Sequence, residues 1–308
     1  MPKYPLRSSP PWHFRLAKWL IRNRLRGGYR LIELAERRGW LNCVVEYELS
    51  ADVKLSVPLW RRENQWALPD LRAYESELVT QLIPQIMLGR MIFPDLWIDV
   101  GADIGVLSAL LASKVGFSEG IVLEPNPVSF EFLEHNAAKL PFPVRAIQAA
   151  AADFTGKGTL AHSPNDPSDH ARFLAPDEGG DLDVVRIDDL GILAGGSMVM
   201  KVDVEGGELA VLKGAAQTLA NASNWCVAFE AHRDVVARTG IDPCECVRFL
   251  AGIDDLFVSV AERNIELDMT RPFFDQFSDK ITNVICTARA GSAVGRTDFK
   301  KGNWPQDT

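Results

Sequence analysis

Acidic side chains follow several apolar runs of this chain, at spacings that would gather them at one edge of a sheet. The clearest case is Leu96–Gly105, Leu-Trp-Ile-Asp-Val-Gly-Ala-Asp-Ile-Gly, where Asp99 and Asp103 flank Gly101. Its first half, Leu96–Val100, predicts a buried strand, and the glycines that follow predict a tight loop before a helix. A unit of this kind forms a nucleotide-type pocket at the carboxyl end of its strand.

The glycine spacing indicates which ligand this loop would accept. A dinucleotide pocket favours Gly-x-Gly-x-x-Gly around a pyrophosphate, whereas this loop reads Asp99-x-Gly101-Ala102-Asp103-x-Gly105. Carboxylates beside the loop would repel a diphosphate but suit a ligand that carries an ammonium and a sulfonium group. The loop therefore favours S-adenosylmethionine, and the missing middle glycine speaks against the alternative of a nicotinamide-dependent oxidoreductase.

Two further strand ends extend the predicted cofactor site. The apolar run that begins at Gly120 ends at Glu124, and Pro125 and Asn126 follow it. An acid at the end of the second strand can accept hydrogen bonds from both ribose hydroxyls. A short third strand is predicted just before Asp153. Its position would bring the Asp153 carboxylate within reach of an adenine amino group.

Charged residues also follow two later apolar runs. Side chains alternate along a strand, so Lys201, Asp203 and Glu205 should share one face, and Glu230 and His232 should share a face of the next strand. Carboxylates and imidazoles can act as general bases. A Lys201–Asp203 ion pair that only neutralises buried charge is the structural alternative. The same oxygen and nitrogen ligands would also suit Mg²⁺ or Mn²⁺, although no metal ligand is assigned.

Composition sets limits on the class of protein. The chain has 308 residues, 47% hydrophobic and 24% charged, and its net charge of -8 argues against nucleic acid as a partner. It has no apolar run of about 20 residues and no N-terminal signal pattern, so we expect a cytoplasmic protein. Five scattered cysteines predict buried free thiols: Cys43, Cys226, Cys244, Cys246 and Cys286.

The first forty residues differ from the rest. Ten basic residues and only two acidic ones are interleaved with Trp12, Trp19 and other apolar residues, which predicts one or two basic amphipathic helices around Gly27-Gly28. Such helices can lie on an anionic membrane surface. The alternative is that their apolar face packs on the domain or on a second subunit, in a homo-oligomer, while the arginines face water. Residues 41–59 then predict a β-hairpin.

One predicted connection, residues 154–183, is unusually long and polar. Residues 154–183 are rich in Pro, Gly, Asp, Ser and His and exceed an ordinary connection in length, which favours either a functional loop or a mobile solvated one. His162 and Asn165 are among the polar side chains that could meet an acceptor there. Further on, the stretch Arg271–Phe274 lies where a substrate wall could form.

Taken together, the motifs resemble the FkbM family of S-adenosylmethionine-dependent methyltransferases. The segments that carry the resemblance are Asp99–Gly105, Glu124–Pro127, Lys201–Glu208, Leu212–Ala215 and Phe229–His232. The resemblance implies a class I methyltransferase fold, Rossmann-like, in which a seven-stranded, mostly parallel sheet lies between helix layers and its last strand is antiparallel. It also implies O-methylation of a small-molecule or glycan acceptor, such as a sugar, a surface glycan or a polyketide-type product.

We therefore predict three regions: a basic helical segment plus β-hairpin in residues 1–70, the methyltransferase domain in residues 71–290, and a tail in residues 291–308. The favoured bases are Asp203 and His232, with Glu230 orienting the imidazole. A non-catalytic binding protein recruited through its basic N-terminal helix is the alternative from another class.

Overall fold

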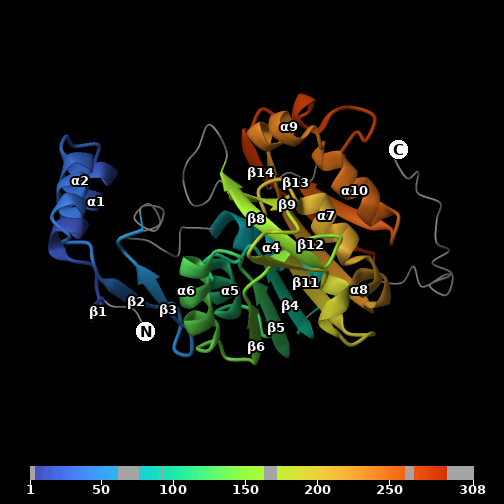
Figure 1. The fold of residues 1–308 in the computed structure, drawn as a ribbon, viewed down its shortest axis with the longest axis horizontal. Coiled ribbons are helices and arrows are strands. Elements are labelled where there is room, and N and C mark those ends of the chain that lie inside the picture. The colour runs from blue at the N-terminus through green and yellow to red at the C-terminus, as the bar shows by residue number, and fades with distance from the viewer. Residues whose placement is uncertain are drawn as a thin grey trace.

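The computed structural model describes residues 4–61, 76–89, 91, 93–162, 172–260 and 267–289. Its centre is a seven-stranded sheet in the order β13-β14-β12-β11-β4-β5-β6 (Figure 1). β14 runs antiparallel to both of its neighbours, β12 and β13, whereas the other neighbouring strands of the sheet pair in parallel. The strand bounds are β4 Leu96–Val100, β5 Glu119–Leu123, β6 Val144–Ile147, β11 Ser197–Val202, β12 Asn224–His232, β13 Leu256–Val260 and β14 Ile281–Ala288. The predicted fold class, mostly parallel with an antiparallel last strand, is confirmed.

Helices cover both faces of this sheet because its central strands are apolar on both sides. Trp97 and Val199 belong to the core shared with α4 and α5, whereas Ile98 and Met200 belong to the core shared with α7 and α10. The helices are α4 Ser76–Leu88, α5 Val106–Ala112, α6 Pro127–Ala137, α7 Glu208–Gly214, α8 Ala216–Asn221, α9 Arg233–Thr239 and α10 Pro243–Ala251, with 3-10 turns η2 Ile187–Leu190 and η3 Phe273–Asp275.

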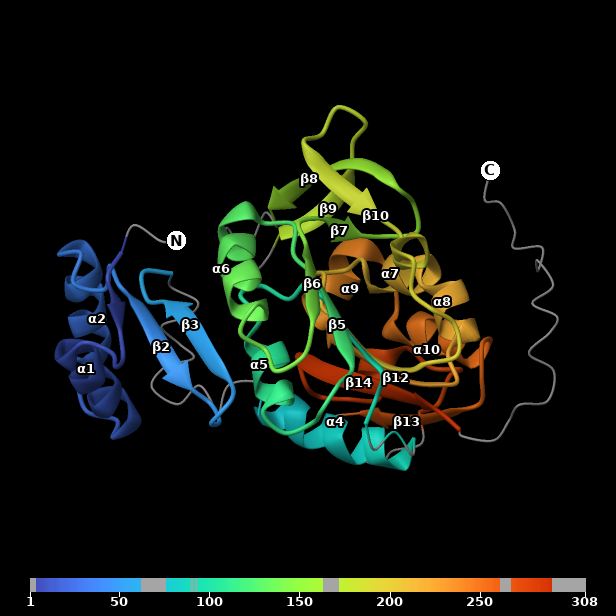
Figure 2. The ribbon, with the colours of Figure 1, turned by 90° about the horizontal axis from the view of Figure 1, so that it is seen from below.

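Residues 4–61 form a separate layer, which we call the N-terminal module. It contains β1 Leu6–Arg7, α1 Trp12–Arg22, α2 Gly28–Arg37, β2 Val44–Glu48 and β3 Lys54–Pro58. The two basic helices and the antiparallel hairpin are present as expected, and the chain turns between the helices at Gly27, whose φ is +99°. The helices lie at the end of the molecule farthest from the central sheet (Figures 1 and 2).

The hairpin joins the module to the main domain at α6. Asn136 donates to the Ser56 carbonyl at 3.0 Å and accepts from the Ser56 N–H at 2.8 Å. Lys139 Nζ lies 2.9 Å from both Glu46 Oε2 and Ser56 Oγ. Asn136 is buried, so the paired backbone bonds fix the orientation of β3 against α6.

The long polar connection is largely sheet, which corrects the expectation of a mobile solvated loop. Strands β7 Ala150–Ala151, β8 Gly156–His162, β9 Arg172–Pro176 and β10 Leu182–Val185 form a four-stranded sheet in the order β7-β10-β8-β9. Residues 163–171, including Asn165, lie outside the described residues. This small sheet buries a hydrophobic cluster of its own, which includes Ala152 and Val184. The polar composition of the segment gives no indication of that cluster.

Three other expectations can be compared with the structure. All five cysteines are buried free thiols, as predicted. Phe273 is fully buried in the core beside α10, so within the stretch Arg271–Phe274 this side chain is not available to line a substrate wall. Within the described part of the chain, none of the helices has both the length and the hydropathy required to cross a bilayer.

Candidate active site

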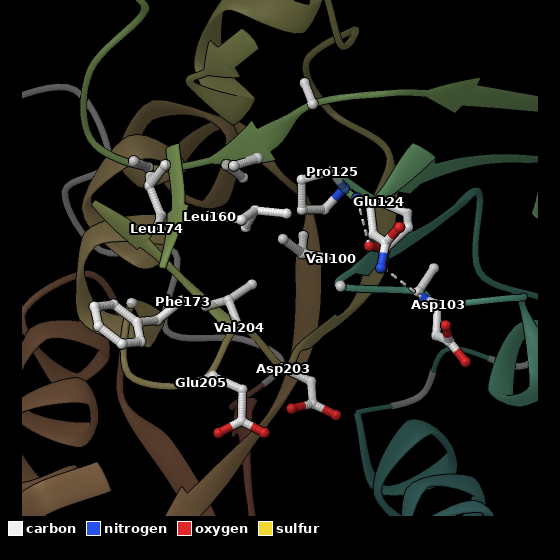
Figure 3. A pocket seen from close by; sticks show the side chains of 18 of the residues that line it. Val100, Asp103, Glu124, Pro125, Leu160, Phe173, Leu174, Asp203, Val204 and Glu205 are labelled. Atoms are coloured by element: carbon white, nitrogen blue, oxygen red, sulfur yellow. Dashed lines mark hydrogen bonds between the residues drawn. The ribbon is translucent and has the colours of Figure 1, made fainter. Parts of the chain in front are cut away.

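A cavity of about 340 Å³ opens at the carboxyl ends of β4, β5 and β11, beneath the small sheet (Figure 3). Its volume is in the range of small-molecule and cofactor pockets. Most residues predicted to bind a cofactor line it, and they come from loops far apart in sequence: Asp99, Gly101, Ala102, Asp103, Glu124, Pro125, Asn126, Asp153 and Asp203. Gly105 is not among its lining residues; it begins α5 with a φ of +84°.

The glycine at position 101 is required by a neighbouring strand. Its φ is +78°, and a Cβ placed on it would lie 1.8 Å from the carbonyl oxygen of Asp203. The Asp203 N–H in turn donates to the Val100 carbonyl at 3.0 Å, so the ends of β4 and β11 are in direct contact. We expected the backbone at Gly101 to approach a ligand closely. It instead approaches the backbone of Asp203, and this contact joins the glycine loop to the loop that follows β11.

Glu124 holds the glycine loop in place. Its carboxylate accepts the Asp103 N–H at 2.9 Å and the Asn126 N–H at 2.8 Å (Figure 3). Asn126 caps α6 by accepting the Val128 N–H at 3.0 Å. Burial, with a further contribution from the charge of Asp103, raises the pKa of Glu124 to about 7. The carboxylate is therefore poised to change its charge near neutral pH.

Arg61, which no sequence pattern singled out, supports this corner of the cavity through two residues that line it, Asp103 and Ser129. The residue comes from the N-terminal module, directly after the hairpin, and its side chain is 6% exposed. Its Nη1 lies 2.8 Å from Asp103 Oδ1 and donates to Ser129 Oγ at 3.1 Å. Asp103 has a φ of +47°, an unusual conformation for a residue other than glycine, so this ion pair stabilises a strained position.

Replacing Arg61 with alanine should destabilise the protein by about 1–3 kcal/mol, because the Asp103 carboxylate loses a charge-assisted hydrogen bond in a partly buried site. The measurement is urea unfolding followed by circular dichroism. Arg145→Ala is the matched control, since Arg145 donates to a single carbonyl at an exposed position, and it should cost less than about 0.5 kcal/mol. Equal losses in the two variants would contradict a special role for Arg61.

A buried charged chain of three residues leads from the sheet to the cavity. Asp99 and Lys201 are direct neighbours in the β4–β11 register, and both are almost fully buried. Lys201 Nζ lies 2.6 Å from Asp203 Oδ2. Burial raises the pKa of Asp99, whose Oδ2 accepts from Ser108 Oγ at 2.5 Å. Its Oδ1 is buried without a hydrogen-bond partner, and Asp99 lines the cavity, so one oxygen of this carboxylate is left for a donor group.

Three carboxylates meet beside this chain. One oxygen from each of Asp203, Glu205 and Glu230 lies within 4.8 Å of the others. The alternation along β11 stops at Val202, where the strand ends, and Glu205 reaches the group through a left-handed backbone with a φ of +57°. In Figure 3 the carboxylates of Asp203 and Glu205 lie side by side at one end of the cavity.

The predicted pair of Glu230 and His232 is placed differently from Asp203. Both residues line a small adjoining cavity of about 20 Å³, and neither is among the residues that line the main cavity. Burial lowers the pKa of His232, and the charge of Asp234 partly offsets that shift. Because His232 Nδ1 is buried without a hydrogen-bond partner, Glu230 does not hold that nitrogen.

An apolar wall faces the acidic group, and sequence reasoning missed it. Leu160 of β8, Phe173 and Leu174 of β9, and Val204 line the same cavity (Figure 3). The guanidinium carbon of Arg238 lies 4.4 Å from the centre of the Phe173 ring. Two short runs on either side of the polar stretch, Gly-Thr-Leu-Ala and Arg-Phe-Leu-Ala, could have indicated these strands. They pair with each other as β8 and β9.

Comparisons with known proteins find sequence similarity to methyltransferases. Residues 99–238 match the model of the methyltransferase FkbM domain. Over 193 residues the chain is 26% identical to the hexuronic acid methyltransferase AglP of Haloferax volcanii, covering 61% of this chain and 72% of that protein.

Two solved structures show partial likeness. A crystal structure of methyltransferase FkbM from Methylobacillus flagellatus is 19% identical with a TM-score of 0.41, and the match covers 63% of this chain and less than half, 43%, of that one. M. jannaschii TYW2, solved in complex with AdoMet, is 12% identical with a TM-score of 0.38 and covers 80% of this chain and 84% of that one. The family match rests on the segment that carries the glycine loop, Glu124 and the acidic group, so residues 99–238 of this chain are similar to the methyltransferase FkbM domain.

Proposed function

We propose that the protein transfers a methyl group from S-adenosylmethionine to a hydroxyl of a sugar, a glycan or a polyketide-type product. The observation that carries the proposal is the cavity itself, in which the glycine loop held by Glu124 and the carboxylates of Asp203 and Glu205 share one lining with an apolar wall. The similarity to a hexuronic acid methyltransferase supports a sugar acceptor. The match to a methyltransferase domain sets aside the nicotinamide-dependent alternative.

The residues present fit such a cofactor. Glu124 would accept hydrogen bonds from the ribose hydroxyls, and Pro125, Asn126 and Asp153 would line the adenosine end. Asp99, whose Oδ1 is buried without a partner, and Asp103 would face the positively charged methionine end. When bound, the cofactor supplies an electrophilic methyl group on a sulfonium.

The acidic group would activate the acceptor. The acceptor hydroxyl would have to lose its proton as it is methylated, and a base of this group would take that proton. We assign that base to Asp203, because its carboxylate lines the main cavity and Lys201 fixes its position at 2.6 Å. His232 lines the adjoining cavity and is the second candidate, which a variant can test.

Calorimetry tests the proposed function directly. Titrating the full chain with S-adenosylhomocysteine should give saturable heat, and S-adenosylmethionine should label a hydroxyl in a panel of sugars, glycans and polyketide-type alcohols. NADH serves as the control ligand and should give no heat. Absence of heat with both sulfur compounds would overturn the proposal.

Cofactor affinity should depend on pH through Glu124. With a pKa of about 7, the carboxyl group is mostly protonated at pH 6 and mostly ionised at pH 8, and the ionised form is the better acceptor for ribose hydroxyls. We therefore expect the dissociation constant of S-adenosylhomocysteine to be about tenfold larger at pH 6 than at pH 8. Calorimetry at a series of pH values measures this, and a flat profile would contradict it.

A metal requirement can be tested at the three carboxylates. Lys201 already places a positive charge 2.6 Å from Asp203, so we expect methyl transfer to change by less than about twofold when EDTA is added. The measurement compares rates before and after EDTA and after addition of excess Mg²⁺ or Mn²⁺. Loss of activity that either ion restores would instead assign Asp203, Glu205 and Glu230 to a metal site.

A further inference from the structure

Helix α1 of the N-terminal module has two apolar faces. The inner face packs on α2, where Phe14 and Ala17 are buried. A Cβ at Gly28 of α2 would lie 2.6 Å from the Ile21 side chain and 2.7 Å from the Ala17 carbonyl, so the two helices are in close contact. The inner face therefore satisfies the packing that an amphipathic helix needs.

The outer face of α1 is also apolar. Trp12, Leu16 and Trp19 follow one another at helical spacing and are 67%, 41% and 54% exposed. Trp40, 43% exposed, lies close by, since the His13 ring is 5.6 Å from the Trp12 ring and 5.2 Å from the Trp40 ring. We call these four residues, Trp12, Leu16, Trp19 and Trp40, the tryptophan patch. Large apolar side chains gathered on one exposed surface indicate an interaction site.

Positive charge is concentrated in the same part of the chain as this patch. Residues 1–40 contain ten basic and two acidic residues, a net charge of +8 in a chain whose total is -8. The arginines of the two helices and their connections are exposed: Arg15, Arg22, Arg24, Arg26, Arg30, Arg37 and Arg38. The module thus combines exposed tryptophans with a concentration of positive charge that the rest of the chain does not share.

The patch lies away from the contacts that hold the module to the main domain. Those contacts come from the hairpin and Arg61, which meet α6 and the glycine loop. Helices α1 and α2 lie on the other side of the hairpin, at the end of the molecule (Figures 1 and 2). The exposed face of α1 can therefore meet a large partner without disturbing the cavity.

We propose that the tryptophan patch and the exposed arginines of the same module bind the surface of an anionic lipid membrane. Tryptophan rings favour the headgroup level of a bilayer, and arginines favour anionic headgroups. A second copy of the chain fits this surface less well, because a two-fold dimer through it would bring two strongly positive modules together. The attachment is peripheral and does not depend on the proposed methyl transfer.

Vesicle flotation of the full chain tests the proposal. We expect the protein to float with vesicles of phosphatidylcholine and phosphatidylglycerol, and to float at least about tenfold less with phosphatidylcholine alone, since each basic residue near the surface adds attraction only to anionic lipid. High salt should weaken the binding because it screens exposed charge. Trp12→Ser/Trp19→Ser and Arg22→Glu/Arg26→Glu should each reduce the bound fraction to the level seen without anionic lipid.

Matched controls change the same chemistry elsewhere. Phe93→Ser/Leu193→Ser removes two exposed apolar side chains, and Lys114→Glu/Lys213→Glu reverses two exposed charges, both outside the module. These variants should float like the unaltered protein, and all variants should keep its circular dichroism spectrum. Absence of flotation with anionic vesicles, or equal loss in the control variants, would overturn the proposal. So would a dimer that Trp12→Ser/Trp19→Ser dissociates in a protein that does not float.

Discussion

Replacing Asp203 with asparagine should lower the methyl-transfer rate by about 10²–10⁴-fold, the contribution expected of a positioned general base. Asparagine keeps the size of the side chain but cannot take the proton of the acceptor hydroxyl. The measurement is the rate with saturating S-adenosylmethionine on an acceptor that the panel identifies. Binding of S-adenosylhomocysteine should remain nearly intact, because the backbone contacts of Asp203 with Val100 and Gly101 do not depend on its carboxylate.

Two further variants decide between the candidate bases. Glu205→Gln changes the neighbouring carboxylate of the same group and should have a smaller effect on the rate than Asp203→Asn. His232→Ala tests the imidazole, which lines the adjoining cavity. A normal rate in both Asp203→Asn and His232→Ala would contradict the assignment of a base to this cluster. A large loss in His232→Ala alone would move the role to the imidazole.

Replacing Glu124 with glutamine should weaken binding of S-adenosylhomocysteine by about 10²-fold. The carboxylate accepts two backbone N–H groups, at 2.9 Å and 2.8 Å, and charge-assisted hydrogen bonds each contribute about 1.5–3 kcal/mol. Glutamine offers only one acceptor oxygen, so its amide would face one of the N–H donors, and the ribose would lose its charged partner. Calorimetry measures the dissociation constant, and the variant should also lose the pH dependence expected of Glu124.

Asp177→Asn is the matched control for this substitution. Asp177 accepts the Gly179 N–H at 3.0 Å in an exposed turn outside the cavity, so the same chemical change should leave cofactor affinity unaltered. The rate of Glu124→Gln at saturating cofactor should stay within about tenfold of the unaltered protein, because the base lies elsewhere. Unchanged affinity in Glu124→Gln would contradict the role proposed for this carboxylate.

The central sheet and the residues at its carboxyl edge follow from local sequence patterns. Apolar runs such as Leu96–Val100 are read directly as buried strands, and glycines and acids at their ends identify the loops. Because parallel strands place their carboxyl ends at one edge, local patterns were enough to predict that Asp103, Glu124 and Asp203 would approach one another.

The side chains that support the glycine loop and form the apolar wall of the cavity could not be predicted, because they come from segments that meet only in the folded chain. Arg61 reaches Asp103 across 42 positions of sequence because the hairpin docks on α6. Leu160 and Phe173 line the cavity because two segments with weak sequence patterns pair with each other as β8 and β9. Glu205 joins the acidic group through a left-handed backbone beyond the strand end, where alternation no longer applies. These contacts depend on long-range packing, and residue spacing carries no information about the distance between segments that meet only after folding.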